Sequence, residues 1–202
     1  MKLKTASYLE QAQNWPTTGR HILAQYDEES VIVYQAYRPS IGLFAAREQY
    51  FGGEFRLNRM SWIKPNFLWM MYRCAWGTKA GQEVILAVRL KRPFFENVLA
   101  QAIPSSYDPD EYSNQAAWKK AVNASQVRLQ WDPDHNPAGG ALKRRAIQLG
   151  LRDEVLEAYA RDAIIEILDI SDFVATQRVY VQSGEYSKLV TPLEAVYLKK
   201  VI

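Results

Sequence analysis

The stretch RMSWIKPNFLWMMYRCAWGTK, residues 59–79, combines tryptophans and methionines with spaced cations. Lys64 ends a short β-like run, and Asn66 follows Pro65 at the start of a helical pattern. The first N–H groups of a helix are unpaired and carry partial positive charge, so a lysine beside them favours an anion. The residues therefore predict an anion-binding pocket at this helix start. The alternative is a core helix whose Lys64 reaches solvent along its aliphatic stem.

The same stretch also predicts a buried helix. Phe67, Met70 or Met71, and Cys74 recur at the spacing of one helical face. A cysteine among such neighbours is typical of a small buried hydrophobe, whereas a nucleophile needs an exposed and electropositive setting. We therefore expect Cys74 to belong to the core.

Most familiar catalytic motifs are absent from the sequence. It has no phosphate-binding GxxxxGK[ST] loop, GxGxxG, GxSxG or HExxH, and its two histidines exclude a multi-histidine metal centre. Asp132, Asp134 and His135 could in principle bind a divalent cation. Asp-Pro and Asn-Pro are strong turn formers, however, so we expect a flexible loop over residues 132–140 and no metal.

Composition places the chain among ordinary globular proteins. Its 202 residues suit one domain, and 25 Lys and Arg against 22 Asp and Glu give a net charge of only +3. Basic pairs among 25 aromatic residues leave open a module that binds single-stranded nucleic acid through Lys143, Arg144 and Arg145. The simpler interpretation of those pairs is a solvated rim of helix and strand ends.

The same composition suggests a cytoplasmic location. A single cysteine, Cys74, excludes an internal disulfide and suits a reducing compartment. The N-terminal residues lack the apolar run of a secretory signal, and no apolar stretch reaches 18 residues. We therefore expect a soluble protein that does not enter the membrane.

Alternating β-like and helical patterns predict a mixed α and β architecture. The clearest strand is the apolar run EVILAVRLK, which is typical of a central position. Strands are expected at 21–27, 30–37, 59–63, 83–91, 125–131 and 144–151, and helices at 39–49, 65–74, 93–102, 114–122 and 152–161. Residues 163–170 are expected to close the sheet or to continue the preceding helix, and the tail from Ser171 to be mostly helical.

One resemblance covers nearly the whole chain. Residues 59–83 read RMSWIKPNFLWMMYRCAWGTKAGQE, which is similar to RMTWIKPSFLWMMYRSGWATKPGQE, the hallmark of a bacterial and fungal domain family of unknown function. The segments at 26–42, 127–136 and 144–151 also resemble that family. Membership in the family implies no activity.

The order of elements resembles, more weakly, ADP-ribosyltransferase-like domains. That resemblance implies catalytic positions at Gln35 and Gln148, with Ser61 and Trp62 at the middle motif. It implies that Tyr37 or Trp62 stacks on the cofactor and that Arg59, Lys64 or Arg73 holds the pyrophosphate of NAD. The chain departs from the pattern because Gln35 replaces a histidine or arginine, and Gln148 lacks a negative charge.

Together these patterns predict an α+β fold in a single domain over residues 18–202, after an N-terminal extension of residues 1–17. We expect a central mixed or antiparallel sheet flanked by helices and similar to ADP-ribosyltransferases. The predicted ligand is NAD or a related nucleotide, used in ADP-ribosyl or related nucleotidyl or phosphate transfer. The alternatives are an RNA-binding module without catalysis and a catalytically silent domain.

Overall fold

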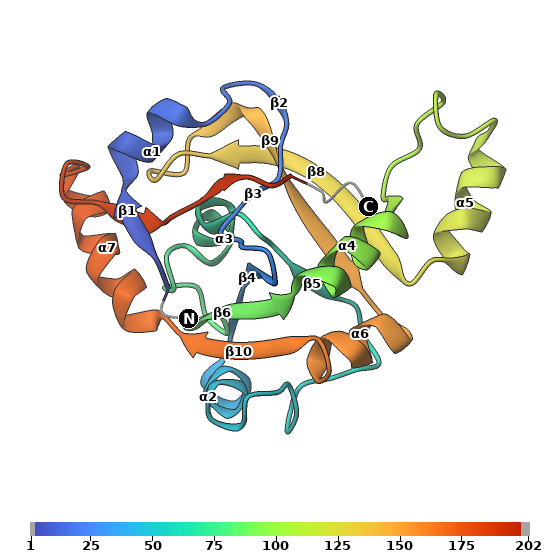
Figure 1. Cartoon of the computed structure of the whole chain (residues 1–202), viewed down its shortest axis with the longest axis horizontal. Coiled ribbons are helices and arrows are strands. Elements are labelled where there is room, and N and C mark those ends of the chain that lie inside the picture. The colour runs from blue at the N-terminus through green and yellow to red at the C-terminus, as the bar shows by residue number, and fades with distance from the viewer. Residues whose placement is uncertain (1–2, 199–202) are drawn as a thin grey trace.

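In the computed structural model, which describes residues 3–198, strand β6 (Val84–Lys91) lies between β4 (Ser30–Tyr37) and β10 (Ile164–Asp169) in an antiparallel sheet (Figure 1). Both neighbours run antiparallel to β6. The apolar run EVILAVRLK is thus a central strand, as predicted, and residues 163–170 close the sheet rather than extend a helix.

This sheet is buried on both faces, which explains why β6 is apolar without alternation. Val33 and Leu86 belong to one hydrophobic cluster, whereas Tyr34 and Ile85, their neighbours in sequence, belong to another. Successive side chains of a strand point to opposite faces, so a strand buried on both sides needs apolar residues at every position.

A second, mixed sheet is built around a long antiparallel hairpin. Strand β9 (Ala141–Leu151) pairs with β8 (Val127–His135), with β2 (Gly19–Arg20) and with β5 (Ser61–Ile63). Strand β7 (Ile103–Pro104) extends it beside β8 in parallel. The predicted mixed or antiparallel sheet is therefore confirmed.

The two sheets meet where β4 approaches the end of β5. The Tyr34 amide donates a hydrogen bond of 2.7 Å to the Lys64 carbonyl, and these residues form an isolated antiparallel bridge. Lys64 therefore stands between the sheets, with its backbone held on the β4 side.

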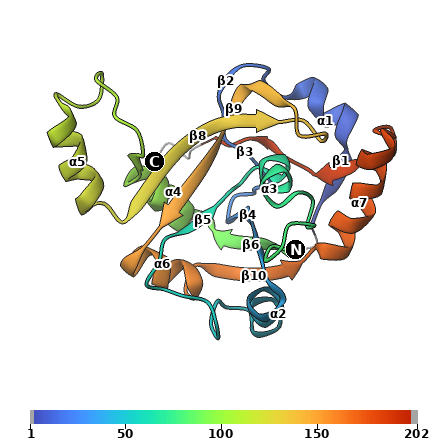
Figure 2. The same ribbon diagram turned by 180° about the vertical axis from the view of Figure 1, so that it is seen from behind.

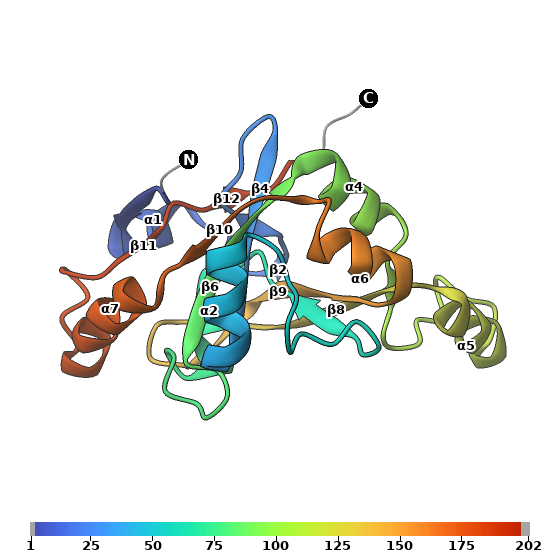
Figure 3. The same ribbon diagram turned by 90° about the horizontal axis from the view of Figure 1, so that it is seen from below.

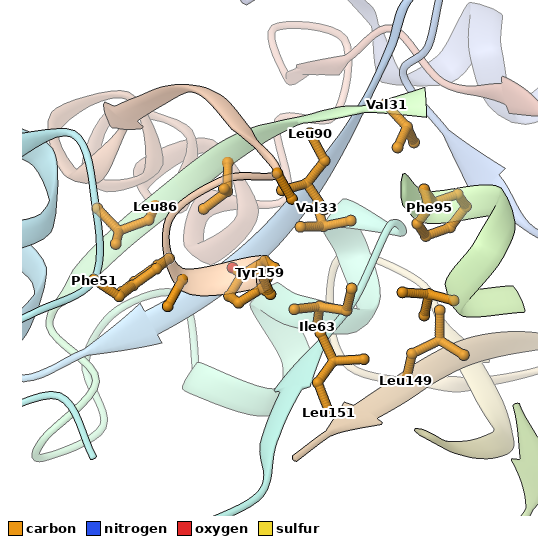
Figure 4. Packing of buried hydrophobic residues seen from close by; sticks show 14 of the residues in the cluster. Val31, Val33, Phe51, Ile63, Leu86, Leu90, Phe95, Leu149, Leu151 and Tyr159 are labelled. Carbon is orange, nitrogen blue, oxygen red and sulfur yellow. The ribbon is translucent and has the colours of Figure 1, made fainter. Parts of the chain in front are cut away.

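Side chains from both sheets fill the space between them (Figure 4). Ile63, Leu149 and Leu151 come from the mixed sheet and lie near Tyr159 in the close-up. Burying each of these large side chains contributes about 1.5–3 kcal/mol. The other labelled members of this cluster are Val31, Val33, Phe51, Leu86, Leu90 and Phe95.

Helices flank the sheets and complete the predicted α+β class. They are α1 (Tyr8–Asn14), α2 (Pro39–Glu48), α3 (Phe67–Cys74), α4 (Arg92–Ala100), α5 (Gln115–Ala124), α6 (Asp153–Ala160) and α7 (Ser171–Ser183). Helix α2 crosses β6 and β10, as the view from below shows (Figure 3). Helix α5 stands away from the body, at the end opposite α1 and α7 (Figure 2). No helix within residues 3–198 is long and apolar enough to cross a bilayer.

Short strands near both termini tie distant parts of the chain together. Strand β1 (Thr5–Ser7) pairs with β11 (Val190–Pro192), and β12 (Ala195–Val196) pairs with β3 (Leu23–Ala24). The prediction of a mostly helical tail is therefore wrong after α7, because Val190–Pro192 and Ala195–Val196 find strand partners far away in sequence.

Two further predictions need correction. Residues 132–135 continue β8 instead of beginning a flexible loop, because Asp132 and Pro133 pair with Ala146 and Arg145. Pro65 precedes α3 rather than occupying its first turn, because Asn66 is the N-cap and its side chain accepts from the Trp69 amide.

Candidate functional site

A cleft of about 550 Å³ opens where β4, β5 and α3 meet. The loop before β5 and residues 81–82 complete its wall. The cleft brings together all but one of the residues that the sequence predicted for a site: Gln35, Tyr37, Arg59, Ser61, Trp62, Lys64 and Arg73. Gln148 is not among the lining residues.

Lys64 is the unusual cation of the cleft. Only 5% of the residue is accessible, and its side chain makes no hydrogen bond or ion pair with any residue in the described range 3–198. Burial and, to a smaller extent, the nearby Arg73 guanidinium lower the pKa of Lys64 to about 8, while Asp132 opposes the shift. The ammonium nitrogen itself is not sealed off from solvent, so a group that enters the cleft can reach it and supply the missing partner.

Other cations reinforce the positive character of the cleft. Arg56, Arg59 and Arg73 line it, are exposed and have no ion-pair partner among the described residues. The acidic lining residue, Glu54, is already paired with Arg38 and accepts a 2.9 Å hydrogen bond from Ser40. The unpaired charge facing the cleft is therefore positive.

Aromatic side chains form one wall. Tyr37 packs edge-on against Phe55, with ring centroids 5.9 Å apart, and Trp62 lines the cleft beside Met60. Trp62 is opposite Gly150 in the β5–β9 register. A Cβ on Gly150 would lie 2.6 Å from the Met60 sulfur and 3.0 Å from two Trp62 ring carbons. This close approach explains a glycine inside a strand, a signal the sequence analysis missed.

Gln35 is held by hydrogen bonds on both sides of its amide. Its Nε2 donates to Ser61 Oγ at 3.0 Å and to the Trp62 carbonyl at 3.1 Å. Its Oε1 accepts from the Tyr159 hydroxyl at 2.5 Å. Tyr37 and Ser61 share a further hydrogen bond of 3.0 Å, and burial raises the pKa of the Tyr37 hydroxyl. Gln35 therefore connects β4, β5 and α6 and positions Ser61.

Gln148 lies beside the cleft rather than in it. The β5–β9 register ends at the pair Ile63–Leu149, one residue before Gln148 is reached, and the Gln148 Nε2 donates a hydrogen bond of 2.8 Å to Asp132 Oδ2. Gln130 donates 2.8 Å to the other oxygen of the same carboxylate. Gln148 thus holds the carboxylate whose charge acts on Lys64, and neither Asp132 nor Tyr159 was predicted for this site.

The start of α3 does not provide the predicted anion pocket. The Asn66 side chain accepts from the Trp69 amide at 2.7 Å, and Glu194 Oε1 accepts from the Phe67 amide at 2.7 Å. Burial raises the pKa of Glu194 well above its usual value. Because residues of the chain already take these donors, an anion in the cleft would meet side-chain cations instead.

The remaining predicted chemistry lies elsewhere. Cys74, the last residue of α3, is buried in the core, as expected, and burial raises the pKa of its thiol. Asp134 is paired with Arg144 at 2.6 Å, and His135 is stacked on Tyr72 with ring centroids 3.5 Å apart. Within residues 3–198 no group of three or more His, Cys, Asp or Glu side chains is arranged to hold a metal ion.

The basic run, residues 143–145, which the alternative prediction assigned to nucleic-acid binding, does not lie on a single face of the protein. Lys143 and Arg145 are exposed, whereas Arg144 is buried against Asp134 and also donates 2.6 Å to the Pro16 carbonyl. Side chains alternate along β9, so these three cations do not form one surface.

Comparison with known proteins agrees with the first resemblance, to a domain family of unknown function, and gives no support to the weaker one, to ADP-ribosyltransferase-like domains. The model of a family described as a domain of unknown function (DUF4291) matches residues 21–197, and the chain therefore belongs to that family. No curated protein matches the chain.

Proposed function

We propose that this member of a family of unknown function binds a nucleotide in the cleft between β4, β5 and α3, and that NAD is the first ligand to test. The observation that carries the proposal is Lys64, a residue with 5% of its surface accessible, whose ammonium group has no partner among the described residues. Phosphate oxygens would supply the missing negative charge and hydrogen-bond acceptors.

The other lining residues suit the rest of a nucleotide. Arg59 and Arg73 present planar guanidinium groups that can pair bidentately with a pyrophosphate. Trp62 and Tyr37 offer aromatic surface to a base or a nicotinamide ring. Cations beside aromatics fit a ligand that is anionic at one end and aromatic at the other.

An ADP-ribosyl or related transfer is the finer part of the proposal. NAD would supply a bond between nicotinamide and ribose whose cleavage develops positive charge. Gln35 would act by holding Ser61 and the β5 backbone in place, since its own amide is already bonded. Gln148 would act through Asp132, a carboxylate that supplies the negative charge a glutamine lacks.

Calorimetry of the full chain with NAD, ADP-ribose and ATP tests binding. We expect one site for at least one of these ligands, with affinity falling more than about tenfold in Lys64→Met, which corresponds to the loss of about 1.4 kcal/mol. Lys79→Met is the matched control, because Lys79 is exposed and does not line the cleft. Absence of heat with all three ligands at millimolar concentrations would remove the proposal.

Titration of the same protein with a single-stranded RNA oligonucleotide tests the alternative function, nucleic-acid binding. Nucleic-acid binding through the basic run would weaken steeply with salt and would fall in Lys143→Ala and Arg145→Ala. Nucleotide binding in the cleft would be unaffected by those two substitutions, because neither residue lines it.

A further inference from the structure

Lys64 differs from the other lysines that the structure describes. Only 5% of Lys64 is accessible. The other described lysines are exposed: Lys4, Lys79, Lys91, Lys119, Lys120, Lys143 and Lys188. An exposed lysine is almost wholly protonated near neutral pH and is a poor nucleophile. A buried lysine that opens into a cleft is the arrangement in which an amine becomes reactive.

The backbone around Lys64 is fixed on both sides. Its carbonyl accepts from the Tyr34 amide at 2.7 Å, the preceding Ile63 is paired with Leu149, and Pro65 follows it. Pro65 also restricts Lys64 itself to extended conformations. The side chain therefore starts from a rigid point and its amine remains at the cleft.

The charges facing this amine come from two elements. Arg73, on α3, disfavours the ammonium form, and Asp132, on β8, favours it, while the Cys74 thiol is a smaller influence. Gln148 and Gln130 bind both oxygens of Asp132, so its carboxylate is directed to them and forms no ion pair with Lys64. Desolvation therefore exceeds the attraction, and a substantial neutral fraction exists near pH 8.

We infer that Lys64 is a nucleophile that forms an imine with a phosphorylated aldehyde entering the cleft. The neutral Nζ adds to the carbonyl carbon, and a C–N bond forms as the carbonyl oxygen takes up a proton. The resulting carbinolamine loses water, so that amine and aldehyde give imine and one water, with no oxidant or reductant. Arg59, Arg73 and Arg56 hold the phosphate, which is why an anionic aldehyde is preferred over a neutral one.

Pyridoxal 5′-phosphate is the probe, followed by borohydride reduction, tryptic digestion and mass spectrometry of the full chain. At pH 8 the neutral fraction of Lys64 exceeds that of an ordinary lysine on the order of 100-fold. We expect one dominant adduct at Lys64, half-maximal labelling near pH 8, slower labelling by pyridoxal and protection by inorganic pyrophosphate. Labelling of Lys64 no faster than that of Lys79 in the same sample would overturn the inference.

Two variants test further whether the adduct forms at Lys64. Lys79→Met is expected to leave the dominant adduct unchanged, and Lys64→Met to abolish it. If Lys64→Met fails to fold, the position of the adduct in the unmodified chain still decides the question. The inference does not rest on nucleotide binding: an adduct at Lys64 in a protein that gives no heat with NAD supports the imine and removes only the nucleotide proposal.

Discussion

The Tyr159 hydroxyl donates a buried hydrogen bond of 2.5 Å to Gln35 Oε1 and so joins helix α6 to strand β4 behind the cleft. The two residues are 124 positions apart in sequence. Burial raises the pKa of Tyr159 well above its usual value, so the hydroxyl remains protonated and able to donate. Through this bond, the core of the domain controls the position of Ser61 and Trp62.

Replacing Gln35 by leucine is expected to destabilise the fold by about 2–4 kcal/mol, because buried donors and acceptors lose their partners. Tyr159→Phe removes one donor and is expected to cost about 1–2 kcal/mol. Urea unfolding of both single variants and the double variant measures the coupling between them. Strictly additive effects would contradict a direct interaction.

Lys64→Met is expected to stabilise the protein by about 1–3 kcal/mol at pH 7 while it weakens ligand binding, because a buried, unpaired charge is removed. The folded pKa of about 8 lies below 10.5, the ordinary value of a lysine, so the unfolded chain binds more protons between these values. The wild-type stability should therefore rise with pH across that window, relative to Lys64→Met.

Urea unfolding of the two proteins at pH 7, 8 and 9.5 checks this expectation. Taking the difference between the proteins cancels the contributions of the buried tyrosines, which titrate at higher pH. If the free energies of unfolding of the wild type and Lys64→Met changed equally with pH, the folded state would carry the Lys64 charge without a penalty, and the expectation would be wrong.

Gly150→Ala is expected to displace Trp62 and Met60 and to weaken nucleotide binding, since its Cβ would lie 2.6 Å from the Met60 sulfur. Gly140→Ala is the matched control, because its Cβ would lie 2.8 Å from the Asn136 side chain, away from the cleft lining. Both variants should lose stability, but calorimetric titration should show a binding defect only for Gly150→Ala. Equal affinities in the two variants would contradict the role given to the Trp62 wall.

Arg144→Met is expected to destabilise the protein by about 3–5 kcal/mol, because Asp134 would remain as a buried, unpaired carboxylate. Its exposed neighbours provide internal controls: Lys143→Ala and Arg145→Ala should each change stability by less than about 0.5 kcal/mol. Thermal or urea unfolding distinguishes the three. A loss of stability shared equally by them would contradict the alternation of β9.

Patterns local in sequence predicted much of this fold. The central β6 was recognisable because both of its faces are buried, and α3 because its apolar residues follow helical spacing. The strands Val190–Pro192 and Ala195–Val196 were missed because they are short and pair with segments more than 170 residues away. The stretch 132–135 was misassigned because turn-forming dipeptides there are overridden by pairing with β9.

In the candidate site, too, residues that are close in sequence were predicted, whereas contacts with remote segments were not. Lys64, Arg73 and Trp62 lie in one contiguous stretch, and the structure brings them to one cleft with Gln35 and Tyr37. Sequence spacing could not show that Gln35 uses its amide on Tyr159, or that Glu194 occupies the start of α3. Those partners come from remote segments, and nothing in their local patterns distinguishes them from other polar residues.

The contact between Glu194 and the Phe67 amide also bears on when the cleft can form during translation. Helix α3, which carries Arg73, has its first turn completed by a residue made 127 positions later. Trp15 and Gln11 likewise bond to residues 194 and 191. A ribosome must therefore release nearly all of this domain before the cleft acquires its final walls, and a nascent chain that stops short of residue 194 would leave the start of α3 open.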